Sequence, residues 1–243
     1  MAMLRSLEPE WLDTLPPDDP RAQHSRRDLR RINGLMGSAA FVARELVRGS
    51  ADGPPRTIAE IGAGDGTLML RVARRLAAPS GQVRAILVDR QPAVSPRTLA
   101  ALGALGWRAE ATTADVFDWL AAPGGGPFDA IVANLFLHHF EAAPLAALLA
   151  LAARRTRQFI ACEPRRSRIA LAGSHLLGLI GCNDVSRHDA VVSVRAGFHG
   201  RELSALWPVA GGWVLRERAY GPFGHAFVAT MDGDGMAGGA AVR

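Results

Sequence analysis

The chain has 243 residues, of which 49% are hydrophobic, so it is long enough for one domain with a substantial core but short for two. Its net charge of +5 raises the question of a nucleic-acid partner, yet all 28 basic residues are arginines, scattered without interleaved aromatic residues. We therefore expect a solvated surface and no nucleic-acid partner. The two cysteines, Cys162 and Cys182, belong to no CxxC or His/Cys cluster, so the sequence predicts neither a metal site nor a disulfide and favours a reducing cytoplasm.

Residues 1–52 are predicted to form an extended segment followed by a helical cap. The first twenty are rich in proline and aspartate, with acidic residues where the apolar core of a signal peptide would lie. Over residues 25–47 apolar side chains recur with a helical period, and breaks at Asn33-Gly34 and at Gly37 are predicted to divide the stretch into two helices. Residues 49–56 are typical of a linker.

Segments with strand and helix patterns alternate after this cap. Strands are predicted at 57–61, 83–88, 108–113, 128–134 and 157–162, and helices near 67–78, 94–105, 116–121 and 142–154. Such alternation favours a parallel sheet with right-handed crossovers. Residues 213–219 and 224–230 are predicted to add a hairpin. The expected fold class is therefore α/β, a doubly wound sheet that is mostly parallel with a C-terminal antiparallel hairpin.

The expected domain comprises residues 53–231. Between the fifth strand and the hairpin, residues 165–205 are predicted to be an insertion. The tail, residues 232–243, is so rich in glycine and alanine that we expect it to be disordered.

The most informative stretch is TIAEIGAGDGT, residues 57–67, where three glycines separate a predicted strand from a predicted helix. In an open parallel sheet, ligands bind at the carboxyl edge, where this loop lies. A dinucleotide fingerprint, GxGxxG, requires glycine at the position of Thr67, so a dinucleotide is not favoured. The loop follows Glu60 instead, whose carboxylate would repel a pyrophosphate and suit a cationic or hydroxyl-rich ligand.

Four segments carry a resemblance to a known family: EIGAGDGT (60–67), LVDR (87–90), TADVFD (113–118) and FDAIVANLFLHHF (128–140). In this order they resemble the class I S-adenosylmethionine-dependent methyltransferases of the bacterial small-molecule type. The resemblance covers roughly residues 55–165 and, more weakly, the terminal hairpin. It implies a Rossmann-like fold and S-adenosyl-L-methionine as the cofactor.

The resemblance also implies which residues bind the cofactor. In that family the glycine loop wraps the methionine part, an acidic residue ending the second strand holds the ribose hydroxyls, an aspartate after the third strand contacts adenine, and the end of the fourth strand lines the methyl donor. The positions that match, with their immediate neighbours, are Glu60, Gly62, Ala63, Gly64, Asp65, Gly66, Asp89, Arg90, Asp115, Val116, Asn134 and Leu135.

His138 and His139 are the candidate catalytic residues, because they follow the fourth strand closely enough to face the methyl group and histidine titrates near neutral pH. We expect one of them to orient or deprotonate the methyl acceptor. A histidine that only packs beside the cofactor is the open alternative. Methyl transfer is an in-line displacement that depends on orientation and exclusion of water, so a dedicated catalytic side chain is not required.

The insertion supplies two candidate substrate-binding residues, His175 and His188. His175 lies in Ile169–Cys182, an uncharged run of 14 residues that is too short to span a membrane and is predicted to be one helix. This helix is either an ordinary buried helix or a lid over an apolar acceptor, with His175 as its polar contact. His188 with Asp189 forms either an oriented imidazole or a capping pair.

In the N-terminal cap, the polar side chains of RDLRRINGLMG are placed to reach the cofactor or the acceptor, or else serve packing alone. The residues concerned are Arg30, Arg31 and Asn33.

The predicted function is methyl transfer from S-adenosylmethionine to a small, rather apolar acceptor of phenolic, quinone-like or polyketide type, on oxygen or on carbon. One alternative is a methyltransferase of nucleic acid or protein, against which NLFLHH stands where an NPPY-type signature would lie. Another is a non-catalytic protein that keeps the cofactor pocket. A nicotinamide dehydrogenase does not fit the loop spacing. The sequence predicts no oligomeric state.

Overall fold

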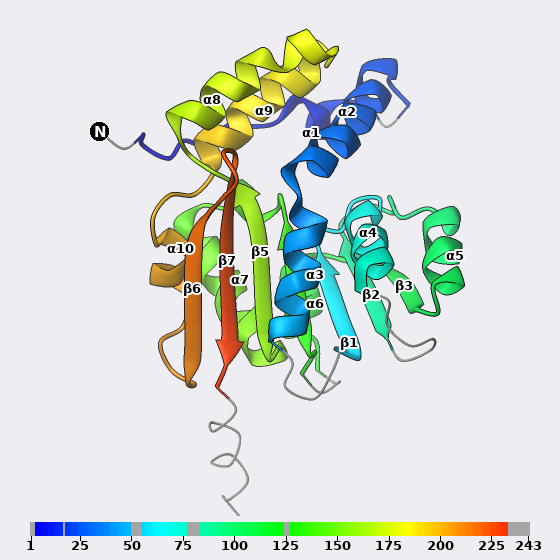
Figure 1. Ribbon diagram of the computed structural model, residues 1–243, viewed down its shortest axis with the longest axis vertical. Coiled ribbons are helices and arrows are strands. Elements are labelled where there is room, and N and C mark those ends of the chain that lie inside the picture. Colours follow the sequence, from blue (N-terminus) through cyan, green and yellow to red (C-terminus); the bar gives the residue numbers. More distant parts are fainter. Residues whose placement is uncertain (1–2, 17, 50–54, 77–82, 124–126, 233–243) are drawn as a thin grey trace, which may run out of the picture.

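The computed structural model describes residues 3–16, 18–49, 55–76, 83–123 and 127–232 of the chain (Figure 1). Seven strands form one sheet in the order β3-β2-β1-β4-β5-β7-β6. They are β1 (Thr57–Ile61), β2 (Arg84–Asp89), β3 (Arg108–Thr113), β4 (Ala130–Asn134), β5 (Gln158–Pro164), β6 (Trp213–Tyr220) and β7 (Gly224–Met231). The first five are parallel, and β7 runs antiparallel between β5 and β6. The predicted mostly parallel sheet with a C-terminal antiparallel hairpin is confirmed.

The direction in which strands are added to the sheet reverses at β1. From β1 the chain proceeds to β2 and β3 on one side and then to β4 and β5 on the other, and ligands bind at such a reversal in doubly wound sheets. Ile61 lies opposite Val88 in β2, and also opposite Ala133 in β4. The residues that follow these three strands therefore meet at one edge.

Helices cover both faces of the sheet, which explains why β1, β4 and β5 are almost continuously apolar and buried. One apolar cluster includes Leu46 and Met69 from helices on the first face, and another includes Leu120 and Leu149 from helices on the second. The helices are α1 (Trp11–Thr14), α2 (Pro20–Met36), α3 (Ser38–Arg48), α4 (Thr67–Leu76), α5 (Pro96–Ala104), α6 (Val116–Ala121), α7 (Ala142–Arg155), α8 (Arg168–His175), α9 (Asp184–Ala196) and α10 (Glu202–Leu206), with 3-10 turns η1 (Leu137–His139) and η2 (Leu176–Ile180).

The N-terminal cap differs from its prediction in two places. The predicted break at Asn33-Gly34 is wrong, because α2 continues through it and only Gly37, with φ 74°, separates α2 from α3. Gly34 instead serves close packing, since a Cβ there would lie 3.2 Å from the Arg71 guanidinium. The segment predicted to be extended contains the short helix α1, whose first amides bond to the Asp189 carboxylate.

The insertion also differs from its prediction. The single helix predicted over Ile169–Cys182 ends at His175 and continues as η2, which ends at Gly181 with φ 81°. A further helix, α9, follows. It packs back on α8 and contacts α1, α2 and η1. The insertion and the N-terminal cap therefore meet above the carboxyl edge of the parallel strands (Figure 1).

Two predictions fall wholly or largely outside the described residues: the linker over residues 49–56 and the disordered tail over residues 232–243. Within the described ranges, no helix has both the length and the apolar character needed to cross a membrane.

The junction of α2 and α3 gives the first testable prediction. Replacing Gly37 by alanine is expected to lower the free energy of unfolding by about 1 kcal/mol, because an L-residue is disfavoured at a φ of 74°. Gly103→Ala is the matched control, because Gly103 has ordinary helical geometry within α5 and an added Cβ would lie in open space. This substitution should raise the free energy of unfolding by about 0.5 kcal/mol. Urea unfolding measures both. Equal effects of the two substitutions would contradict this account of the junction.

Candidate functional site

The glycine loop after β1 has no side chains where a ligand would approach. Gly62, Gly64 and Gly66 adopt φ values of 67°, 53° and 73°, a region that side-chain-bearing residues rarely occupy. A Cβ on Gly62 would lie 2.3 Å from the ring of Phe136, and one on Gly66 would lie 3.0 Å from Leu87. Glycine is thus required at these positions by both backbone conformation and space.

Asp89, the last residue of β2, fixes the loop. Its carboxylate accepts a hydrogen bond from the Gly64 amide at 2.8 Å and one from the Gln91 amide at 2.9 Å. The Ala63 amide donates to the Val88 carbonyl at 3.0 Å. The loop and the end of β2 therefore form one unit, with backbone N–H groups and a carboxylate side by side.

Glu60 is the electrostatic centre of the loop. Its side chain is buried, and Oε2 accepts no hydrogen bond from any described residue. Burial raises the pKa of Glu60 well above its ordinary value, and the nearby charges of Asp65 and Asp89 raise that pKa further. Three carboxyl groups thus converge at the carboxyl edge of the sheet, which favours a cationic ligand and disfavours a pyrophosphate.

The end of β4 contributes a strained turn and a second unsatisfied polar atom. Leu135 adopts φ 52°, the one positive value among described residues other than glycine. Its amide donates to the Cys162 carbonyl at 2.8 Å. Within the described chain the buried Asn134 Oδ1 has no hydrogen-bond partner. Strained backbone of this kind is characteristic of functional sites, where surrounding structure maintains it.

Three of the predicted cofactor residues follow β2 and β3 at the carboxyl edge of the sheet. Asp115 is the N-cap of α6, and its carboxylate accepts a hydrogen bond from the Phe117 amide at 2.8 Å. This cap is formed without any ligand. Val116 is buried behind it, and Arg90 is exposed just beyond β2.

His138 and His139 lie in η1, directly after the end of β4. His138 is buried, and its Nδ1 is 2.8 Å from Glu163 Oε2, while Glu163 Oε1 accepts from the Phe136 and Leu137 amides at 3.1 and 3.0 Å. Burial alone would lower the pKa of His138, but interactions with Glu10 and Glu163 outweigh burial and raise it to about 9.

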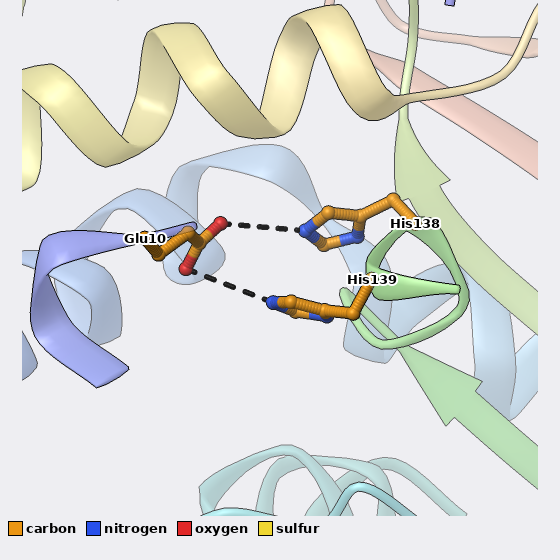
Figure 2. Close-up of side chains that lie close together, drawn as sticks. All are labelled: Glu10, His138 and His139. Carbon is orange, nitrogen blue, oxygen red and sulfur yellow. Dashed lines mark ion pairs between the residues drawn. The ribbon is translucent and has the colours of Figure 1, made fainter. Parts of the chain in front are cut away.

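His139 is more exposed, and its ring lies 4.2 Å from that of His138. Its Nδ1 is 3.0 Å from the Phe136 carbonyl oxygen, and its Nε2 is 3.7 Å from Glu10. Burial would raise the pKa of Glu10, yet the two histidines hold it below its usual range. Figure 2 shows the Glu10 carboxylate facing the edges of both rings, with one oxygen directed toward each.

Glu10 and Glu163 were not among the sequence candidates. Glu163 carried a usable signal, because an acidic residue near the carboxyl end of a parallel strand lies at the ligand-binding edge. Glu10 carried none, since it lies in a segment rich in proline and acidic residues, far from the histidines along the chain.

The two histidines of the insertion do not join this group. His188 stacks on Trp11 with ring centroids 3.9 Å apart, and its Nδ1 is 2.9 Å from Asp189. Asp189 also accepts the Trp11 and Leu12 amides, at 2.8 and 3.0 Å. His188 therefore helps to fasten α1 to α9. His175 is exposed at the last residue of α8, and Leu179 beyond it is 83% exposed, so the predicted apolar face is not buried.

The N-terminal cap reaches the glycine loop through α2. Arg30 lies 3.4 Å from the Asp65 carboxylate, and its carbonyl oxygen accepts from the Arg71 side chain at 3.0 Å. Arg31 instead approaches the buried Asp28 at 3.8 Å, and the buried Asn33 Oδ1 has no partner in the part of the chain that the structure describes. Of the three predicted cap residues, Arg30 is thus placed beside the loop.

Residues 58–158 match the family described as a methyltransferase domain. This stretch runs from the second residue of β1 through the glycine loop, β2 to β4 and η1 to the first residue of β5. The sequence matches none of the curated proteins with which it was compared.

Solved methyltransferase structures share the fold. An O-methyltransferase family protein from Burkholderia thailandensis aligns with a TM-score of 0.61 and 20% identity, over 89% of this chain and 61% of that one. The chain thus spans less than two thirds of that protein. A plantazolicin methyltransferase in complex with SAH aligns at 0.63 and 12% identity, over 88% of this chain and 92% of the other. Magnesium protoporphyrin IX methyltransferase from Synechocystis with bound SAH aligns at 0.54 and 14%, over 85% and 86%.

The matched domain, the strand order and the carboxylate-flanked glycine loop agree with one another. Residues 58–158 thus match the methyltransferase-domain family, and the chain shares the fold of solved methyltransferases.

Proposed function

We propose that this protein transfers the methyl group of S-adenosylmethionine to a small, rather apolar acceptor of phenolic, quinone-like or polyketide type, on oxygen or on carbon. The observation that carries the proposal is the side-chain-free loop with Glu60, Asp65 and Asp89 around it. S-adenosylmethionine carries a sulfonium and an ammonium group, so three converging carboxyl groups suit it. The neighbours include an O-methyltransferase family protein and a magnesium protoporphyrin IX methyltransferase, which supports methyl transfer to a non-polymeric acceptor.

The proposed roles of the cofactor residues follow from their positions. The backbone of Gly62 to Gly66 holds the methionine part, and Asp89 holds the ribose hydroxyls with lone pairs that the Gly64 and Gln91 amides leave free. Asp115 and Val116 border the adenine, with Arg90 at the rim. Asn134 and Leu135 line the methyl group, where the unsatisfied Asn134 Oδ1 is available.

When bound, the cofactor supplies an electrophilic methyl group. The protein aligns acceptor, methyl and sulfur in one line and excludes water, and the insertion and cap that meet above the carboxyl edge of the sheet support the latter role. An acceptor hydroxyl must lose its proton as the new bond forms. We propose that one of His138 and His139, which Glu163 and the Phe136 carbonyl hold in position, orients this hydroxyl or takes its proton on a ring nitrogen.

Substrate binding by His175 and His188, which the sequence predicts, remains a proposal. The His188 ring stacks on Trp11 of α1, and His175 is exposed at the end of α8. We also propose a cytoplasmic location, which the two free, buried cysteines support.

A polymer acceptor is the second candidate, and one surface favours it. A groove on the β6 side is lined by residues that include Arg48, Arg201, Arg216 and Arg218. However, Arg48 and Arg216 pair with the buried Glu45 at 3.3 and 2.7 Å, and β6 is separated from β1 by three strands. The small acceptor is therefore the better-supported choice.

Calorimetry and turnover test the proposal. The protein is expected to bind S-adenosylmethionine saturably and NAD not at all, and to methylate members of a panel of phenols and quinols but neither RNA nor protein. A protein that binds NAD instead, or that methylates only the polymers, would contradict the proposed function. A protein that binds the cofactor without methylating any substrate would support the non-catalytic alternative.

Glu60 gives a pH-dependent prediction. Because burial and the nearby carboxylates raise its pKa in the free protein, Glu60 holds its proton to higher pH than an ordinary glutamate, and a cationic ligand favours its ionised form. Cofactor binding should therefore release protons and tighten as pH rises through the titration range of Glu60. Calorimetry in two buffers of different ionisation enthalpy measures the released protons.

Glu60→Gln is expected to abolish this proton release and to weaken binding by about tenfold or more. Glu110→Gln is the control, because Glu110 is an exposed residue of β3 that pairs with Arg84. It should leave both quantities unchanged. Identical proton release in wild type and Glu60→Gln would show that another group is responsible.

A further inference from the structure

Three side chains from two distant parts of the chain bring oxygen and nitrogen atoms that can bind a metal ion close together (Figure 2). Glu10 belongs to the extended segment before α1, and His138 and His139 belong to η1. The carboxylate oxygens of Glu10 lie 3.6 Å from His138 Nε2 and 3.7 Å from His139 Nε2. One oxygen and two ring nitrogens all fall within 4.8 Å of one another.

The partners of the two rings determine which nitrogen is available. The Phe136 carbonyl can only accept, so His139 Nδ1 carries a hydrogen, and Nε2 of the neutral ring presents its lone pair. Glu163 imposes the same tautomer on His138, since its carboxylate accepts at Nδ1 and is itself held by two backbone amides. In its neutral form each ring therefore directs a lone pair toward the Glu10 carboxylate, and in the ion-free protein a proton occupies this nitrogen of His138 below the raised pKa of about 9.

Such an arrangement of lone pairs requires a cation between them, either protons on the rings or a metal ion. The separations favour a metal ion, because 3.6 and 3.7 Å exceed hydrogen-bond distances. The ligands of a tetrahedral zinc ion, bound at about 2.0–2.1 Å, lie roughly 3.3 Å apart. The buried His138 Nε2 also lacks a hydrogen-bond partner among the described residues.

We propose that Glu10, His138 and His139 bind a divalent transition-metal ion, with zinc as the best match, and that Glu163 orients His138 from the other side of the ring. Two imidazoles and one carboxylate are a ligand set that zinc uses in catalytic sites, where a fourth position stays open. A carboxylate on the remaining nitrogen of a metal-binding histidine is a common supporting contact.

The surroundings hold this site in place without the ion. Ser193 in α9 donates a hydrogen bond to Glu10 Oε1. Arg5 donates to the His138 and Phe140 carbonyls at 3.2 and 2.9 Å, which ties the N-terminal segment to η1. The His139 side chain is 35% exposed, so the cluster borders solvent on the side of this residue.

This inference deepens the proposed function but does not depend on it. If the protein methylates an oxygen, an acceptor bound at the open position would become more acidic, because a zinc ion lowers the pKa of a bound hydroxyl. The metal would then assist loss of the acceptor proton, in place of direct abstraction by a ring nitrogen. Metal binding itself can be measured on protein to which neither cofactor nor acceptor has been added.

The test is titration of chelator-treated, dialysed protein with Zn²⁺ by competition calorimetry, and with Co²⁺ by visible spectroscopy. We expect one equivalent to bind, with the intense absorption of four- or five-coordinate cobalt. Glu10→Gln and His139→Ala should each weaken Zn²⁺ binding by about tenfold or more. His199→Ala is the control, because His199 is an exposed histidine outside the cluster, and it should bind like wild type.

Circular dichroism establishes that each variant is folded, and titration with S-adenosylmethionine in the presence of EDTA separates this test from that of the proposed function. Wild-type protein that binds no zinc, or Glu10→Gln protein that binds it as tightly as wild type, would overturn the metal site and leave a pair of protonated histidines beside Glu10. Loss of cofactor binding with zinc binding retained would count against the proposed function alone.

Discussion

The hydrogen bond from the Gly64 amide to the Asp89 carboxylate connects the two strands on which the site depends. It requires that the loop after β1 turn back over the end of β2, which only glycine-rich backbone with positive φ can do here. The same turn brings the buried Glu60 beside Asp65 and Asp89. A cluster of carboxyl groups costs free energy in the empty protein, and a cationic ligand removes that cost. Fold and ligand preference therefore arise from a single constraint at the carboxyl edge of the sheet.

The second half of the site is assembled across the chain. Asp189 in α9 caps α1, His188 stacks on Trp11, and Arg5 bonds to carbonyls of η1, so the N-terminal segment is attached to the insertion and to the end of β4. These contacts deliver Glu10 to the two histidines that follow β4. The cap therefore does more than close over the sheet, because it contributes a carboxylate to the chemistry that we propose.

The sequence predicted those elements whose residues act locally. The five parallel strands, the hairpin and the glycine loop follow from apolar runs and glycine spacing, and these were confirmed. The continuity of α2 through Gly34 and the end of α8 at His175 were not predicted, because packing against Arg71 and against α9 determines them. Glu10 was inaccessible to sequence reasoning for the same reason. Its partners are defined by tertiary contacts, and no spacing rule connects it to His138. The sequence contains no metal-binding motif, so it gave no indication of the cluster.

The most direct test of the account is a crystal structure of the protein with S-adenosylhomocysteine. The account predicts density for this ligand across the loop of Gly62 to Gly66, with its amino group on the Glu60 side, its ribose hydroxyls at Asp89 and its sulfur directed toward Asn134 and η1. Ligand density elsewhere on the molecule, with the Glu60 and Asp89 carboxylates untouched, would contradict the central claim that these carboxylates and the glycine backbone form the cofactor site.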